Sequence, residues 1–320
     1  MLNVQNEMQQ KQVNFNNRMS VDIDTSMLRG DLREQEPMSR HTSWKTGGDA
    51  DYYYRAADID DLSVFMSRLP IDMPITWIGF GSNLLVRDGG LSGAVISVVG
   101  VLDELETINE TEIIAGAGVP SAKAARFAAQ QGLGGIEFLA GIPGTIGGAL
   151  AMNAGAYGGE VWQYITQAET INRKGERKVY PKDQFEIGYR CVSLPEDEWF
   201  VACNLDLEIS DKDTVERRIT NMLSDRAVAQ PLGQHSCGSV FRNPPDDHAA
   251  RLIDDCGLKG KQVGGATVSE KHANFIINSG NATSSDIEQL IELIQATVFE
   301  KHVVELIPEV RIIGESRRGQ

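Results

Sequence analysis

The chain has 320 residues, of which 41% are hydrophobic and 23% charged. These values are typical of a globular protein with room for about two domains. The formal net charge of -15 argues against a nucleic-acid or anionic-membrane partner, although a local basic pocket stays compatible with it. No apolar run approaches the ~20 residues of a membrane helix, and the first residues lack the basic flank and apolar core of a signal peptide.

The cysteines at positions 191, 203, 237 and 256 have no metal-like spacing. We therefore expect reduced, mostly buried thiols, no metal site and a cytoplasmic location.

The first 36 residues are rich in Asn and Gln and poor in aromatic residues, which predicts a disordered tail.

A helix is expected over 58–69, with Asp58 as its N-cap. A strand over 75–78 runs into a Gly-x-Gly-Ser-Asn turn, whose N–H groups can bind an anion. Strand character resumes over 91–99.

A strand over 112–119 precedes a helix over 121–131. The spacing Gly116-x-Gly118-x-x-Ser121 loosely resembles a dinucleotide-binding fingerprint. The third glycine is missing, and the acidic residue at about the right spacing, Glu137, lies in a glycine-rich stretch instead of at a strand end. A Rossmann domain is therefore disfavoured.

Residues 134–160 are rich in glycine and small apolar residues. Such a stretch loses much conformational entropy on ordering. Two interpretations stay open: tight turns between buried elements, or a main chain that lies close against a flat or anionic ligand.

The second half of the chain predicts strands over 165–171, 178–180 and 200–205, and then a helix over 213–229. A loop over 230–238 leads to a short helix over 248–256, a strand over 275–278, a helix over 285–299 and a final strand over 306–314.

Six short motifs together point to one family: residues 81–84 (GSNL), 140–148 (AGIPGTIGG), 153–158 (NAGAYG), 189–190 (YR), 238–244 (GSVFRNP) and 308–311 (PEVR). In this order, and spread over residues 40–314, they resemble the UDP-N-acetylenolpyruvoylglucosamine reductases of peptidoglycan synthesis. The chain is most similar to the shorter, second type, which lacks an extra tyrosine-bearing loop.

The resemblance implies an α+β fold. Residues 37–212 would form an FAD-binding domain of the vanillyl-alcohol-oxidase (PCMH) type with two α+β lobes, and residues 213–320 an α/β substrate-binding domain. It places the pyrophosphate of non-covalent FAD on Gly81, Ser82, Asn83 and Leu84. It places the isoalloxazine ring against Gly141, Ile142, Pro143, Gly144, Thr145, Gly147, Gly148, Asn153, Ala154 and Gly155. NADPH as the reductant, and a monomeric state, also come from the resemblance.

The implied reaction passes a hydride from NADPH through FAD to an enolpyruvyl ether, which becomes a lactyl ether. Ser239 matches the family's proton donor, and Arg190 and Glu309 match the groups that stabilise the developing enolate. From the residues alone, other interpretations stay open: a turn serine, a surface ion-pair arginine and a solvent-facing strand glutamate.

Candidate substrate contacts are Asn243, Lys259, Arg242, His272 and Asn274, with solvated surface as the alternative. Cys237 is a competing nucleophile that we interpret as a packing residue, because no His is placed by sequence to activate it. Two further functions stay open: another FAD-dependent oxidase or dehydrogenase on this scaffold, and an inactive precursor-binding protein.

Overall fold

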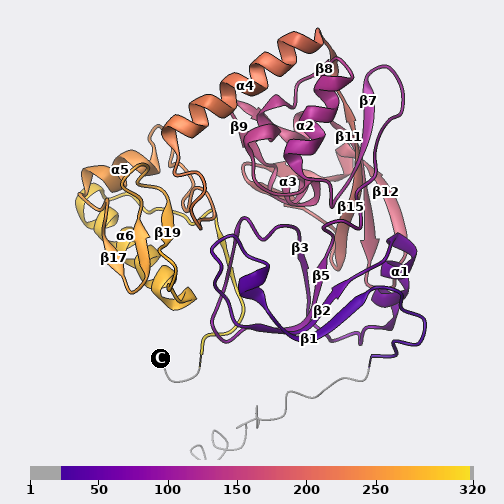
Figure 1. Cartoon of the computed structure of the whole chain (residues 1–320), viewed down its shortest axis with the longest axis horizontal. Helices are drawn as coiled ribbons and strands as arrows, with labels where there is room; N and C mark the ends of the chain where they lie inside the picture. The colour runs from indigo at the N-terminus through magenta and orange to yellow at the C-terminus, as the bar shows by residue number, and fades with distance from the viewer. Residues whose placement is uncertain (1–22, 318–320) are drawn as a thin grey trace, which may run out of the picture.

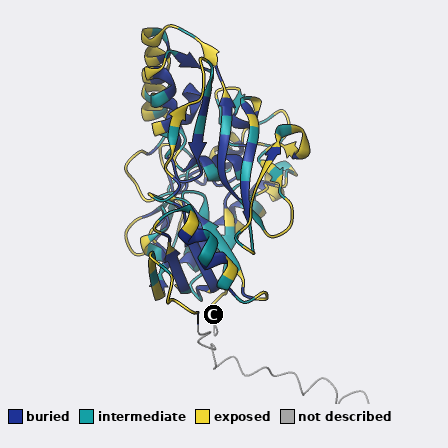
Figure 2. Ribbon diagram, turned by 90° about the vertical axis from the view of Figure 1, so that its right-hand side faces the viewer, coloured by how far each residue is buried: buried dark blue, intermediate teal, exposed yellow. Residues whose placement is uncertain are grey.

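The computed structural model describes residues 23–317, which form three bodies (Figure 1). We call them the first lobe (residues 23–100), the second lobe (101–211) and the C-terminal domain (212–310). Buried residues gather in the strands of the sheets, whereas helix surfaces and loops are exposed (Figure 2). Within residues 23–317, no helix is long and apolar enough to cross a membrane.

The first lobe contains a four-stranded sheet with the order β1-β2-β5-β3. Its strands are β1 (Asp31–Pro37), β2 (Asp49–Arg55), β3 (Ile75–Ile78) and β5 (Leu91–Ser97). β1 pairs antiparallel with β2, whereas β5 pairs parallel with both β2 and β3. Helix α1 (Ile59–Arg68) packs on one face, and the side chain of Asp58 accepts a hydrogen bond from the Asp61 N–H, so the predicted N-cap is confirmed.

Strand β1 corrects part of the predicted N-terminal tail. Residues 1–22 of that tail lie outside the described residues, but the ordered chain includes β1, before the predicted boundary at residue 37. The segment has few apolar residues of its own. It is ordered by its main-chain pairing with β2 and by the buried Glu36 carboxylate, which is 2.9 Å from the His41 ring. These long-range contacts leave no local signature in the sequence.

The second lobe contains a five-stranded antiparallel sheet with the order β12-β11-β15-β7-β6. Its strands are β6 (Leu105–Thr107), β7 (Glu112–Gly116), β11 (Ile165–Asn172), β12 (Arg177–Pro181) and β15 (Glu198–Asp206). Because β7 has only antiparallel neighbours, the strand–turn–helix after it is not a Rossmann unit. Helices α2 (Ser121–Gln130) and α3 (Ile146–Met152) belong to the core of this lobe.

Short elements complete the two lobes. The paired strands are β8 (Leu133–Gly134) with β16 (Glu208–Ile209), β9 (Gly155–Ala156) with β10 (Gly159–Glu160), and β13 (Glu186–Gly188) with β14 (Cys191–Ser193). The 3-10 turns are η1 (Met38–Arg40), η2 (Glu137–Gly141), η3 (Val161–Gln163) and η4 (Lys182–Gln184).

The long helix α4 (Lys212–Ala229) leads from the second lobe to the C-terminal domain (Figure 1). That domain packs α5 (Ala249–Asp255) and α6 (Ser284–His302) with a small sheet of β17 (Gln262–Val263), β18 (Ala266–Val268) and β19 (Ile276–Asn278). The helices predicted in this region are confirmed. Their caps are Asp211 for α4 and Thr283 for α6.

The chain then returns to the first lobe. Strand β20 (Arg311–Ile313) pairs parallel with β4 (Leu84–Val86), so the final strand is shorter than predicted and its sheet partner belongs to the first lobe. Next to it, Arg87 forms a bidentate pair with Glu288 of α6, with a closest approach of 2.7 Å. Together these contacts join the C-terminal domain firmly to the first lobe.

The buried carboxylate of Asp61 provides a test of the first lobe. It accepts hydrogen bonds from the Tyr54 hydroxyl at 2.5 Å, the Arg29 N–H at 2.7 Å and the Ala57 N–H at 2.8 Å. Burial favours the protonated form, but these hydrogen bonds outweigh burial and hold the pKa of Asp61 below its usual value.

We expect Asp61→Asn to lower the free energy of unfolding by about 1–3 kcal/mol at pH 7, measured by denaturant titration. A depressed carboxyl pKa stabilises the fold above the unfolded-state pKa of ~3.9, and this contribution is lost as the pH falls through the folded-state pKa. The difference from wild type should therefore shrink in acid. Asp60→Asn, at an exposed neighbour, should have little effect. A difference that does not change with pH would contradict this assignment.

Candidate active site

The three bodies meet around a cleft of about 610 Å³. Its walls come from the turn after β3, from the glycine-rich stretch around α3, and from α4 and the loops of the C-terminal domain. Segments that lie far apart in the sequence therefore converge on one cavity.

The turn after β3 lies too close to neighbouring segments for side chains at its two glycines. Gly81 has a φ of +58°, and a Cβ added there would overlap the carbonyl oxygen of His41. A Cβ at Gly79 would lie 2.5 Å from the Thr145 hydroxyl oxygen. Across the cleft, the Ser82 hydroxyl donates to the Pro143 carbonyl at 2.8 Å. This turn needs glycine for its geometry, and it brings bare main chain to the cleft.

Most of the predicted cofactor residues line this cleft. They are Gly81, Ser82, Asn83, Leu84, Gly141, Ile142, Pro143, Gly144, Thr145, Gly148, Ala154 and Gly155. The glycine-rich stretch therefore faces an open cavity, as the ligand interpretation requires.

Two predicted cofactor residues, Gly147 and Asn153, do not line the cleft. Gly147 packs against Ala117, where an added Cβ would lie 2.8 Å from the alanine Cβ. Asn153 is buried with a left-handed backbone at the end of α3. Its amide donates to Glu160 at 2.8 Å and to the Gly188 carbonyl at 3.1 Å. The geometry gives both residues a supporting position beneath the cavity wall.

The cleft also contains buried polar atoms that have no hydrogen-bond partner among residues 23–317. They are Trp77 Nε1, Ser121 Oγ, Thr145 Oγ1, Arg190 Nε, Arg226 Nε and Gln230 Oε1. An unpartnered buried polar group is unfavourable by about 1–3 kcal/mol. Hydroxyl, N–H and guanidinium groups of this kind fit a ligand that carries phosphates and a carboxylate.

Arg190 lies where the second lobe meets the C-terminal strand. Its Nη1 and Nη2 atoms donate to the carbonyls of Asn153 at 3.2 Å and Gly155 at 2.7 Å. Its Nε lies 3.4 Å from Glu309 Oε1, and its φ is +57°. Two of its five N–H donors are thus used by the glycine-rich stretch, and the others remain for a ligand.

Glu309 reaches the same point from the opposite side. Its N–H donates to the Val240 carbonyl at 2.7 Å, and its own carbonyl accepts from the Asn83 amide at 3.0 Å. Burial raises the pKa of its carboxyl, and the positive charges of Arg190 and Arg242 offset this only in part. The site therefore favours a protonated carboxyl more than water does.

Ser239 lines the cleft on a segment that Asn274 holds in place. The buried Asn274 amide accepts from the Phe241 N–H at 2.9 Å and donates to the Phe241 carbonyl at 2.8 Å. Its main-chain carbonyl also accepts from the Val240 N–H. Asn274 lines the cleft, but its amide is occupied by Phe241, so the geometry favours a role in positioning Ser239.

The other predicted substrate contacts lie in different surroundings. Asn243 lines the cleft, whereas Arg242, Lys259 and His272 do not. Lys259 pairs with Asp254 at 2.6 Å, and the His272 ring lies edge-on to Phe275. Arg242 lies close enough to act on the Glu309 charge. Direct substrate contact by these three residues stays a prediction without support from the cleft geometry.

Sequence reasoning missed Arg226 of α4. Its guanidinium lies against Gly141 at the cleft wall, and burial lowers its pKa. The neighbouring Tyr157 hydroxyl donates to the Met222 carbonyl of the same helix at 2.8 Å. Nothing in the mixed charge pattern of α4 distinguishes Arg226 from its exposed neighbours, so no sequence signal was available.

The described cysteines form no disulfide; Cys203 and Cys237 are buried, Cys256 is half-buried and Cys191 is exposed. Burial raises the pKa of Cys237 to about 12, which keeps the thiol protonated beside the Leu84 carbonyl at 3.5 Å. This supports the packing interpretation.

No cluster of metal-binding side chains occurs within the described part of the chain.

Comparison with known proteins shows which family shares this arrangement. Residues 230–313 match the model of the C-terminal domain of UDP-N-acetylenolpyruvoylglucosamine reductase, and residues 50–179 match that of an FAD-binding domain. The UDP-N-acetylenolpyruvoylglucosamine reductase of Alkalilimnicola ehrlichii is 54% identical over 288 residues, which cover 90% of this chain and 96% of the relative. The reductase of Legionella pneumophila (strain Lens) is 52% identical, with coverages of 92% and 97%. The chain belongs to the UDP-N-acetylenolpyruvoylglucosamine reductase family.

A solved structure agrees. The crystal structure of the reductase (MurB) from Thermus caldophilus has a TM-score of 0.77 and 31% identity, covering 89% of this chain and 99% of that one. The resemblance drawn from the six motifs is confirmed, as is the expected α+β fold with an FAD-binding domain and a reductase C-terminal domain.

The turn at Gly81 provides a test of flavin binding. We expect Gly81→Ala to lose most of its bound FAD, because the new Cβ would overlap His41 and displace the turn. The flavin content of the purified protein, read from its absorbance, measures this. Gly100→Ala is the control: Gly100 also has a positive φ, of +69°, but has no atom within 4 Å of an added Cβ. Equal flavin loss in both variants would contradict a specific role for the turn.

Proposed function

We propose that this protein is an FAD-dependent reductase that converts the enolpyruvyl ether of UDP-N-acetylglucosamine to the lactyl ether, with NADPH as the reductant. One observation carries the proposal. Arg190 and Glu309 approach each other to 3.4 Å in the cleft that Ser239 also lines, next to main chain suited to a flavin. The family's relatives carry this reductase name.

The residues present fit FAD. Trp77 Nε1, Ser121 Oγ and Thr145 Oγ1 are buried at the cleft without partners, and the turn at Gly79–Gly81 allows a ligand to approach bare main chain. Residues 81–84 would hold the phosphates, and residues 141–145 with 154–155 would lie against the ring system. Bound FAD supplies hydride transfer between NADPH and the substrate's methylene carbon.

Arg190 suits the carboxylate of the enolpyruvyl group. After hydride addition at the methylene carbon, negative charge spreads over the neighbouring carbon and this carboxylate. The guanidinium is held by two main-chain carbonyls, so little reorganisation is needed when the charge develops. Its remaining N–H groups can pair with the carboxylate.

Glu309 can assist only as a neutral acid, since a carboxylate would repel the developing charge. Its raised pKa supports that state. Ser239 completes the reaction by giving its hydroxyl proton to the carbanion-like carbon. A serine hydroxyl is a weak acid, but this acceptor is basic enough to take its proton.

An inactive precursor-binding protein would not need these three groups in one cleft, and no feature of the cleft favours an oxidase.

A cytoplasmic, monomeric enzyme remains part of the proposal. Size-exclusion chromatography with light scattering tests the monomer, and a stable dimer would contradict it.

Ser239→Ala tests the proton donor. We expect flavin reduction by NADPH to stay near the wild-type rate, while reoxidation by the enolpyruvyl substrate slows by about 10²–10⁴-fold, because only the second half-reaction needs the hydroxyl proton. Anaerobic stopped-flow absorbance separates the two steps. Ser224→Ala, at an exposed position of α4, is the control. Equal losses in both half-reactions would show that Ser239 has another role.

Glu309→Gln tests the neutral acid. In the wild type, substrate reduction should slow as the pH rises through the raised pKa of Glu309, since the carboxyl then loses its proton. The amide keeps its N–H donors at every pH, so the variant should lose this alkaline limb. We expect its low-pH rate to stay within about tenfold of wild type. An unchanged pH profile of the substrate half-reaction would assign the limb to a different group.

A further inference from the structure

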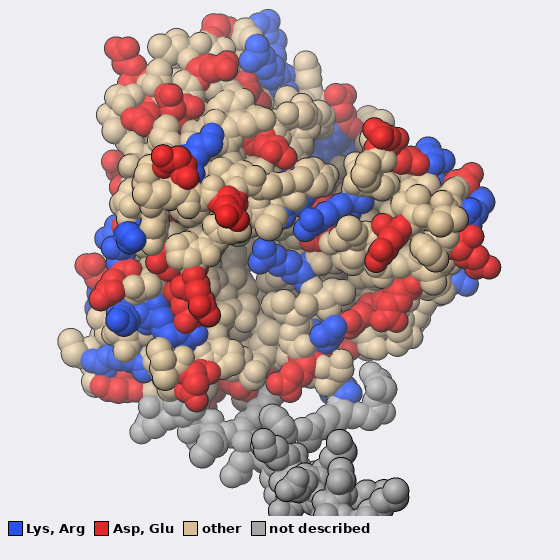
Figure 3. All heavy atoms as spheres, turned by 180° about the vertical axis from the view of Figure 1, so that it is seen from behind, with Lys and Arg blue, Asp and Glu red and all other residues tan. Residues whose placement is uncertain are grey.

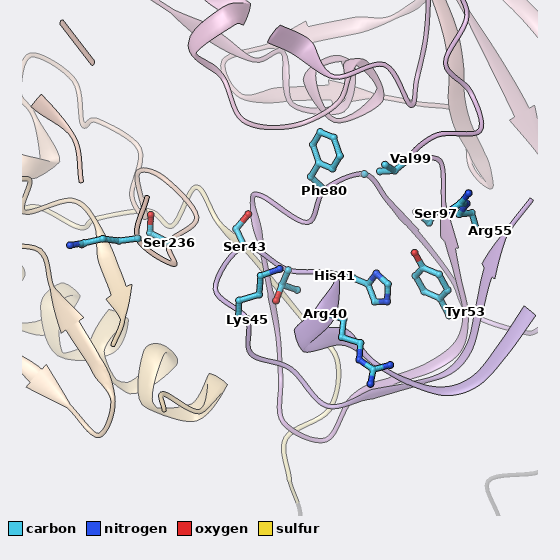
Figure 4. Close-up of a pocket in the computed structure, with 13 residues that line it drawn as sticks. Arg40, His41, Ser43, Lys45, Tyr53, Arg55, Phe80, Ser97, Val99 and Ser236 are labelled. Carbon is cyan, nitrogen blue, oxygen red and sulfur yellow. The ribbon is translucent and has the colours of Figure 1, made fainter. Parts of the chain in front are cut away.

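A second cleft lies against the turn after β3, beside the flavin cleft. Its volume is about 460 Å³, within the range of small-molecule sites. Gly79 and Phe80 are the lining residues that the two clefts share. The remaining walls come from residues 40–43 and 45, from the ends of β2 and β5, and from residues 234 and 236 of the C-terminal domain (Figure 4).

The charges in this second cleft differ from those of the rest of the molecule. Arg40, Lys45 and Arg55 line it, together with His41, and no Asp or Glu does. The chain as a whole has a net charge of -15, and acidic and basic side chains are interspersed on the face shown in Figure 3. All the Lys, Arg, Asp and Glu side chains that line the second cleft are basic, in contrast to the negative charge of the whole chain. This local positive charge favours an anionic ligand.

Two of these cations have no carboxylate partner. Within residues 23–317, neither Lys45 nor Arg55 has a carboxylate oxygen within 4.0 Å. Glu36, buried behind the cleft, is shared among Arg33 at 3.2 Å, Arg40 at 3.6 Å and His41 at 2.9 Å. Two of the cations that line the cleft therefore form no ion pair with the described residues.

The wall between these charges is firmly built. The His41 ring stacks on Tyr53 with centroids 4.2 Å apart, and the ring nitrogen of His41 is held by Glu36. Lys45 has a φ of +60°, a backbone conformation that is unfavourable for a residue with a side chain. Such strain is often retained at binding sites. Figure 4 shows Lys45 between Ser236 on one side and Tyr53 and Arg55 on the other.

We propose that the second cleft binds an organic phosphate of about the size of a nucleoside diphosphate. Lys45 and Arg55 hold its phosphates, and the half-exposed ring of Phe80 (41% exposed) packs against its base. The volume exceeds the needs of a single phosphate ion. Because Gly79 and Phe80 belong to the turn that borders the flavin cleft, such a ligand contacts the main chain that positions the flavin.

Isothermal titration of ADP into FAD-saturated protein tests this site. We expect saturable binding of one ADP, weakened by added salt. Lys45→Gln and Arg55→Gln should each lower the affinity about tenfold. Lys123→Gln, at an exposed position of α2 outside both clefts, should not change it. Flavin content and thermal stability show that each variant is folded; if Lys45→Gln fails to fold, Arg55→Gln carries the comparison.

Competition separates the two clefts. ADP should bind with the same affinity after the protein is loaded with the enolpyruvyl substrate or with NADP⁺. Displacement of ADP by either compound would place it in the flavin cleft and overturn the proposal. So would binding that occurs only after FAD is removed, an affinity unaffected by both charge variants, or no binding at all. None of these outcomes depends on the reductase activity, so the two proposals can fail separately.

Discussion

The contacts of Arg190 connect every part of the active site. Its guanidinium donates to the carbonyls of Asn153 and Gly155 in the second lobe and lies 3.4 Å from Glu309, whose main chain is tied to Asn83 of the first lobe. One positive charge therefore bridges elements from three bodies at the cleft. The left-handed backbone of Arg190 is unfavourable for a non-glycine residue. The contacts of the guanidinium hold it there, at the end of the hairpin formed by β13 and β14.

Around this charge, the cleft depends on glycines that let neighbouring segments approach closely. Gly79 permits the close contact of the first lobe with Thr145 of the second lobe, and Gly81 permits a close contact with His41 inside the first lobe. Asn274 holds the strand-like segment that carries Ser239. The residues that perform chemistry are few. Most of the surrounding contacts position these residues, since fully hydrogen-bonded polar networks make their surroundings rigid.

The sequence was most informative where local chemistry is distinctive. The glycine-rich stretch stood out by its composition alone. Ser239, Arg190 and Glu309 were candidates only through the resemblance of their motifs to a family, because a single serine, arginine or glutamate carries no distinctive local signal. Helices with a clear apolar face or a capping sequence, such as α1 and α6, could also be predicted. Strand β1 could not, because its order comes from pairing with β2. Arg226 was missed for a related reason: only the packing of α4 against Gly141 distinguishes it. Gly147 and Asn153 were predicted to contact the cofactor, but they lie behind the cleft wall. A sequence motif does not reveal which of its residues face a cavity and which support its wall.

The return of the chain to the first lobe has a consequence for how the enzyme is made. Glu309 lies just before β20, which can pair with β4 only after the whole C-terminal domain has been synthesised. A partly translated chain would therefore lack both the carboxyl group of Glu309 and the strand that pairs with β4. With the role proposed for Glu309, catalytic competence is coupled to completion of the polypeptide.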